Sequence, residues 1–106
     1  MADALKRLVG PVALGTSAAT VYTAPGGGSA SILDLQVCNE SGSTVSFTLS
    51  IGTDGAGKRL HYQEDVASHK SFQRTGNIYV GASEVIQAYA SAGTSLTLTI
   101  SGIETT

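Results

Sequence analysis

The sequence has no tryptophan, one cysteine and few charges, and each shortage argues against a class of protein. The single cysteine, Cys38, excludes an intrachain disulfide framework and a zinc site built from several cysteines. The lack of tryptophan and an aromatic content of 6% weaken the case for a sugar-binding module, because sugar platforms favour large aromatic faces.

Charged residues make up 13% of the 106 residues, about half of the ~25% in an average soluble domain. A surface short of charge and rich in Ser, Thr and Gly suits a protein covered by neighbouring chains, although a soluble monomer fits the same composition. The net charge of −2 and scattered basic residues argue against a nucleic-acid partner, which needs clustered Lys and Arg. These basic residues are Lys6, Arg7, Lys58, Arg59, Lys70 and Arg74.

No apolar run approaches the length of a membrane span, and none follows Lys6 and Arg7 as it would in a secretory signal. We therefore expect a product made and left in a cytoplasm, without a membrane partner. Residues 1–8 are the only helix-like stretch, since they contain no β-branched residue, but they are too few for a stable isolated helix. We interpret residues 1–8 as an N-terminal arm, frayed or docked onto a neighbour, and residues 9–106 as one domain.

From residue 9 onward apolar residues recur at every second position, which is typical of strands with one buried face. In residues 31–39, Leu33, Leu35 and Val37 are expected to share the buried face. Residues 44–51 alternate most cleanly, and residues 40–43 between them have turn composition, which predicts a β-hairpin. The inner row of residues 44–51 is expected to be Val45, Phe47, Leu49 and Ile51.

The whole pattern predicts an all-β fold, a single-domain antiparallel β-sandwich resembling a jelly roll, with about eight strands; a closed barrel is the second choice. A loop at residues 52–57 is expected to be exposed, and a turn is expected at residues 74–76. The expected strands are residues 12–14, 20–23, 31–39, 44–51, 58–66, 71–72, 77–80, 84–90 and 95–103.

No residue pattern predicts a catalytic, metal or cofactor site, so we expect a protein that is not an enzyme. The separation of His61 and His69 matches no usual zinc spacing, and His61 is expected on the polar face of its strand. Glu64 and Asp65 are adjacent, so on a strand they point to opposite faces and make a poor acid–base pair. Asp34 and Glu84 can join them only if the fold brings them together.

Two further groups of residues have a structural and a functional interpretation. Cys38 is interpreted as a small semi-buried residue, because no histidine is near in sequence to activate it as a nucleophile. The four tyrosines can form a sugar platform or an interface core if they are exposed together, or they can pack separately at sheet edges. Tyr22 is expected to be structural, because it leads into a glycine turn. The tyrosines are Tyr22, Tyr62, Tyr79 and Tyr89.

Several segments between residues 10 and 104 resemble small virion proteins of tailed bacteriophages, of the head-decoration or minor tail type. The resemblance covers residues 16–26, the strand ending in Val37, Cys38 and Asn39, the Ser41-Gly42 turn with the strand after it, residues 86–91 and residues 98–104. Residues 59–74 are more polar than this family's pattern, which marks them as a variable contact surface.

The resemblance implies a β-sandwich subunit that forms a homo-oligomer, commonly a trimer, and binds the major capsid protein or tail proteins in the virion. Because the chain is short and without fibre-like repeats, capsid decoration is the favoured function. The alternatives are a minor tail or tail-tip protein and a carbohydrate-binding module for host-surface glycans.

Overall fold

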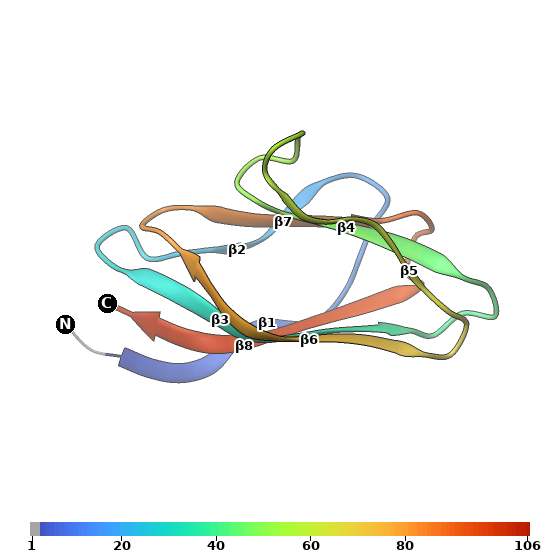
Figure 1. Ribbon diagram of the computed structural model, residues 1–106, viewed down its shortest axis with the longest axis horizontal. Coiled ribbons are helices and arrows are strands. Elements are labelled where there is room, and N and C mark those ends of the chain that lie inside the picture. The colour runs from blue at the N-terminus through green and yellow to red at the C-terminus, as the bar shows by residue number, and fades with distance from the viewer. Residues whose placement is uncertain (1–2) are drawn as a thin grey trace.

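The computed structural model describes residues 3–106 and contains eight antiparallel strands in two four-stranded sheets packed as a sandwich (Figure 1). This part of the chain has no helix of the length and apolarity needed to cross a bilayer. The strands are β1 (Asp3–Ala13), β2 (Ala19–Thr23), β3 (Ser29–Asn39), β4 (Val45–Ile51), β5 (Arg59–Val66), β6 (Ser71–Val80), β7 (Val85–Ala90) and β8 (Leu96–Thr105).

The strand order confirms the jelly-roll-like sandwich predicted from the sequence. One sheet, here sheet A, has the order β1-β8-β3-β6, and the other, sheet B, has the order β2-β7-β4-β5. The strands pair as in a long hairpin that has been rolled up, first with last: β1 with β8, β2 with β7, β3 with β6 and β4 with β5. The edge strands are therefore β1 and β6 in sheet A and β2 and β5 in sheet B.

The core lies between the sheets and is filled by the alternate apolar residues of their central strands. Leu98 and Ile100 of β8 and Phe47 and Leu49 of β4 are at most 1% exposed. Burying a side chain of this size stabilises the fold by about 1.5–3 kcal/mol relative to leaving it in water. The inner row expected for β4 is confirmed, with Ile51 partly buried at its end.

The expected β-hairpin at residues 40–43 is wrong, because this turn carries the chain from sheet A to sheet B. β3 pairs with β6 and β8, whereas β4 pairs with β5 and β7. Both strands lie in the interior of their sheets, so each has two partners that are distant in sequence. Local alternation and a turn predict two adjacent strands, but they do not determine which strand lies beside which.

The segment expected as an N-terminal arm is the first part of β1, so the strand runs across the boundary expected at residue 9. Asp3 pairs with Thr105 and Arg7 with Ser101 of β8. The helix-like composition is overridden by the backbone partner that β8 offers, since strand preference depends strongly on context. Met1 and Ala2, also part of the expected arm, lie outside the described residues.

Strand β6 continues through residues 74–76, where a turn was expected, because a bulge accommodates the glycine there. Gly76 has a φ of 145°, and the register of β3 with β6 shifts between Ile32 and Asp34. At the same place the register of β3 with β8 shifts with the extra residue in β3, and this removes Leu33 from the core row that the sequence predicted. Ile32, at 2% exposure, takes the inward position before the bulge, and Leu35 takes it afterwards.

Candidate interaction surfaces

The open side of the sandwich between edge strands β5 and β6 is closed by a cluster around His61. Its ring lies 5.5 Å from the ring of Phe47 and 5.1 Å from that of Phe72. Arg74 Nη1 lies 3.3 Å from His61 Nε2, and Glu64 Oε1 lies 3.6 Å from Nδ1. Because Arg74 can only donate, Nε2 accepts and the neutral ring carries its proton on Nδ1, toward Glu64. The expected surface position of His61 is wrong, since its side chain is only 9% exposed.

Bulges in β5 turn His61 toward the core. The pairing of β4 with β5 shifts register on both sides of Leu49, and His61 stands opposite this buried leucine. Gln63 has a left-handed φ of 51°, and its N–H donates to Thr48 Oγ1 at 3.2 Å instead of continuing the ladder. One extra residue moves the following side chains to the other face of a strand, so simple alternation fails here.

The position of His61 predicts a pH dependence of stability. Burial, followed by the positive charge of Arg74, lowers the pKa of His61 below its ordinary 6.5, against the opposing effect of Glu64. As the pH falls, the unfolded chain binds the proton first, so the folded state loses stability. We expect the free energy of unfolding, measured in urea, to be smaller at about pH 5.5 than at about pH 7.5.

The variant His61→Gln should reduce this difference, because it removes the titrating group. His69→Gln changes an exposed histidine and serves as the matched control, which should keep the pH dependence of the wild type. If the free energy of unfolding of His61→Gln differed between the two pH values as much as that of the wild type, His61 would not be the source of the pH dependence.

The opposite open side, between edge strands β1 and β2, is closed by Glu104 of β8. Tyr22 Oη donates to Glu104 Oε2 at 2.5 Å, and Lys6 Nζ donates to Oε1 at 2.9 Å. The hydrogen bond from Tyr22, followed by that from Lys6, lowers the pKa of Glu104. Burial and the nearby carboxylate raise the pKa of Tyr22. Tyr22 thus joins the two sheets, in keeping with the structural role expected for it.

The acidic residues weighed for catalysis are spread over the fold, with Glu64 and Asp65 on β5, Asp34 on β3 and Glu84 in the turn before β7. Glu64 stands opposite Phe47 and Asp65 opposite Ser46, so adjacent carboxylates face opposite sides of sheet B. Asp34 accepts from Gln73 Nε2 at 3.1 Å, and Glu84 accepts from the N–H of Gly81 at 2.6 Å. In residues 3–106, no three or more His, Cys, Asp or Glu side chains are grouped as metal ligands would be.

Cys38 lies exposed on the outer face of sheet A, opposite Ser71 and Thr97. The expected semi-buried position is wrong, because Val37 and Asn39 on either side fill the inward positions of β3.

Between β3 and β6 a shallow depression beside Leu33 and Gly76 has no room for a water molecule.

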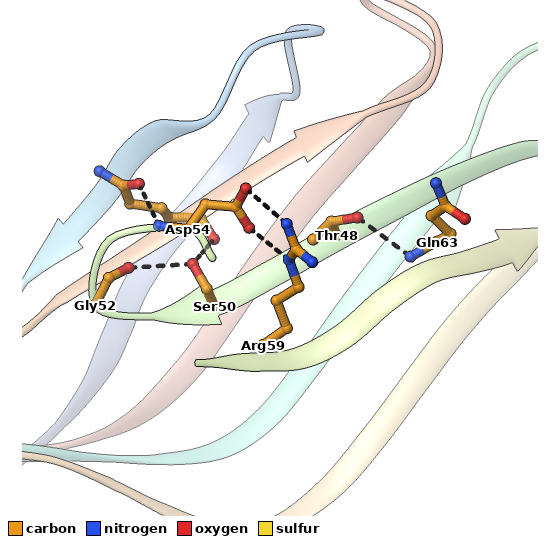
Figure 2. A network of polar contacts seen from close by, with 7 residues as sticks. Thr48, Ser50, Gly52, Asp54, Arg59 and Gln63 are labelled. Carbon is orange, nitrogen blue, oxygen red and sulfur yellow. Dashed lines mark hydrogen bonds and ion pairs between the residues drawn. The ribbon is translucent and has the colours of Figure 1, made fainter. Parts of the chain in front are cut away.

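The β4–β5 loop, residues 52–57, is tied down onto the outer face of sheet B. Arg59 Nε and Nη2 donate to the two carboxylate oxygens of Asp54 at 3.0 and 3.3 Å, and the N–H of Asp54 donates to Gln87 Oε1 at 3.0 Å (Figure 2). Ser50 Oγ donates to Gly52 O at 3.1 Å, and Ser50 is fully buried although it points outward. Part of the loop expected to be exposed therefore covers the centre of this face.

The tyrosines do not form one platform. The Arg59 guanidinium carbon lies 4.4 Å from the ring centroid of Tyr62, which is 56% exposed on sheet B. The hydrogen bond that Arg59 donates to Asp54 is the largest cause of the raised pKa of Arg59, and Tyr62 and Tyr89 add to it. Tyr79, which is 67% exposed, projects from β6 of sheet A.

A row of four facing residues, here called the apolar row, crosses the outer face of sheet A; three of them are apolar and the one on β3 is a serine. Leu5 of β1 stands opposite Ile103 of β8, Ile103 opposite Ser31 of β3, and Ser31 opposite Tyr79 of β6. Leu5 is 77% exposed, so the row has an exposed apolar residue at each end. The outward positions in the rows beyond it are Arg7, Asp34, Cys38 and, for the larger part, Ser, Thr and Gln: Ser101, Thr75, Thr99, Gln36, Gln73, Thr97 and Ser71.

Comparisons of the chain with protein families and with curated proteins find no match. The arguments for function therefore rest on the surfaces described above and on the resemblance seen in the sequence.

Proposed function

We propose that this chain is a non-enzymatic structural protein of a tailed-phage virion, favoured as a capsid decoration protein, that assembles with copies of itself and with the particle. The observation that carries the proposal is the outer face of sheet A, where an apolar row runs from Leu5 to Tyr79 between rows of Ser, Thr and Gln. The resemblance of the sequence to virion proteins supplies the setting.

The chemistry of this face favours a large, dry contact with another protein. Charged side chains lose their hydration when an interface closes, whereas hydroxyl and amide groups can exchange water for a partner at little cost. Apart from the charged Asp3, Arg7 and Asp34, the outer face of sheet A offers such groups together with apolar surface. A minor tail or tail-tip subunit needs the same kind of face, and it remains the alternative within the virion.

Particles purified from cells that produce the chain should contain it in a fixed ratio to the major capsid protein, and electron cryomicroscopy should place it at repeated lattice positions. The variant Gln36→Lys puts a charge at an exposed position of the outer face of sheet A, and we expect it to lower occupancy at least about tenfold. Gln63→Lys makes the same change on sheet B and should leave occupancy unchanged.

Particles free of the chain would contradict the proposal, as would equal occupancy of both variants. Repeated positions on the tail instead of the head would select the tail alternative. If the chain did not bind particles but bound a glycan, and Tyr62→Ala abolished that binding, a carbohydrate-binding function would replace the proposal. Tyr62 is the residue to change because its ring is exposed.

A further inference from the structure

One half of edge strand β1 is regular and unprotected. The register of β1 with β8 shifts between Arg7 and Val9 and again between Val9 and Val12, so its second half is bent by bulges and contains Pro11. Such irregularities prevent an edge from pairing with another chain. Residues 3–7 have no register shift, and their outer edge has no strand partner within the described residues.

The side chains of residues 3–7 are complementary to themselves. Asp3, Leu5 and Arg7 alternate with Ala4 and Lys6, so the three share the outer face of sheet A. When this segment is reversed and laid beside itself with Leu5 at the centre, Asp3 stands opposite Arg7. Cross-strand pairs of opposite charge and of apolar residues stabilise antiparallel ladders.

We propose that residues 3–7 of β1 pair antiparallel with the same residues of a second copy of this chain. A two-fold axis passes beside Leu5, so that Leu5 meets Leu5 and each Asp3 meets Arg7 of the other copy. On the inner face each Ala4 meets Lys6 of the other copy. The two copies of sheet A then form one continuous sheet, which is the strand-addition mode of association.

Other registers of this pairing place like charges together or leave a charge without its partner. Antiparallel pairing in one continuous sheet keeps outward-facing residues opposite outward-facing residues. A pairing of two identical segments must therefore be centred on a residue and not between two residues. Centring on Lys6 opposes two lysines, and centring on Arg7 opposes two arginines. Centring on Ala4 leaves Arg7 without Asp3. Leu5 is thus the centre that satisfies both charges.

In the free subunit, the side chains of Asp3, Leu5 and Arg7 are accessible to a second copy. All residues from 3 to 7 are exposed, so neither sheet B nor a loop covers either side of this part of β1. The side chain of Arg7 forms no hydrogen bond or ion pair with any residue from 3 to 106. Among residues 3–106, the Asp3 carboxylate accepts a hydrogen bond from Thr105 Oγ1 alone, at 2.7 Å, through Oδ1, and Oδ2 faces no other donor of this part of the chain.

This interface goes beyond the proposed function, which requires assembly but does not specify how one copy of the chain contacts another. It makes the smallest assembly a dimer with two-fold symmetry, in place of the trimer that the resemblance favours. The β1 pairing and the virion proposal can be contradicted independently of each other. A trimer that ignores changes in β1 would overturn the β1 pairing and leave the virion proposal standing.

Sedimentation velocity over a range of protein concentrations tests the pairing. The wild type should be a dimer that dissociates on dilution. Arg7→Asp opposes two carboxylates twice across the axis, and Asp3→Arg opposes two arginines twice, so each should weaken the dimer at least about tenfold. The double variant with both changes restores opposite charges and should return the dissociation constant to within about threefold of the wild type.

Asp65→Arg reverses an exposed charge on edge strand β5 and is the matched control, which should dimerise like the wild type. Circular dichroism of each variant checks that the sandwich is folded. A wild type that is monomeric at every concentration overturns the proposal. So does a dimer that the single charge reversals leave unchanged, or a double variant as weak as the singles.

Discussion

Gly102→Ala should lower the free energy of unfolding by about 3 kcal/mol, because β8 has no space for a methyl group at this position. A Cβ on Gly102 would overlap the backbone oxygen of Ser31 and lie 3.1 Å from Leu8 Cδ1. Ser31 O belongs to a strand interior, so relieving the contact requires β3 and β8 to move apart. Urea unfolding monitored by circular dichroism measures the loss.

Gly42→Ala is the matched control for this change. A Cβ on Gly42 meets nothing within 4 Å, and this glycine lies in the exposed turn between β3 and β4. We expect its free energy of unfolding to stay within about 0.5 kcal/mol of the wild type. Equal stability of the two variants would mean that β3 and β8 do not approach as closely as described.

Asn39→Asp should also destabilise the fold by about 3 kcal/mol near neutral pH, although it replaces one atom by another of similar size. Asn39 is 1% exposed, and its Nδ2 donates to the backbone oxygens of Ser43 and Val66, both at 2.8 Å. Its Oδ1 accepts from the N–H and Oγ of Ser41. A carboxylate keeps the acceptor but turns two hydrogen bonds into repulsion between oxygens.

The exposed Asn77 of β6 provides the control, since Asn77→Asp makes the same chemical change at the surface. We expect it to shift the free energy of unfolding by no more than about 0.5 kcal/mol. Thermal and urea unfolding of both variants at the same pH compare them directly. If Asn39→Asp proved as stable as Asn77→Asp, the crossing from sheet A to sheet B would not depend on Asn39.

The class of fold was predictable from the sequence because burial on one side of a strand imposes a period of two. Val45, Phe47 and Leu49 follow that period without interruption, and they form the inner row of β4. Where a bulge intervenes the rule fails. The sequence around Leu33 and around His61 alternates no differently from that of a straight strand, so nothing local signals the extra residue.

The partners of strands were not predictable in the same way. The turn after Asn39 has the composition of a hairpin, yet hydrogen bonds to Ser43 and Val66 hold the chain on a path between the sheets. These contacts depend on residues that come together only when the whole sandwich forms. The self-complementary charges of β1 were hidden for a related reason, because Asp3 and Arg7 can meet the same residues of a second copy in an antiparallel ladder only if the segment is an edge strand.

The anchored loop between β4 and β5 offers a position at which residues can be inserted into the chain. Its fixed contacts lie at its base, where Arg59 and Gln87 hold Asp54, whereas Ala56 and Gly57 are exposed beyond them (Figure 1). Lengthening a loop adds only about 0.6 kcal/mol of closure entropy per doubling. A foreign peptide inserted at this tip would be displayed away from sheet A, so the molecule has a natural site for carrying an epitope without disturbing the contacts proposed for sheet A and β1.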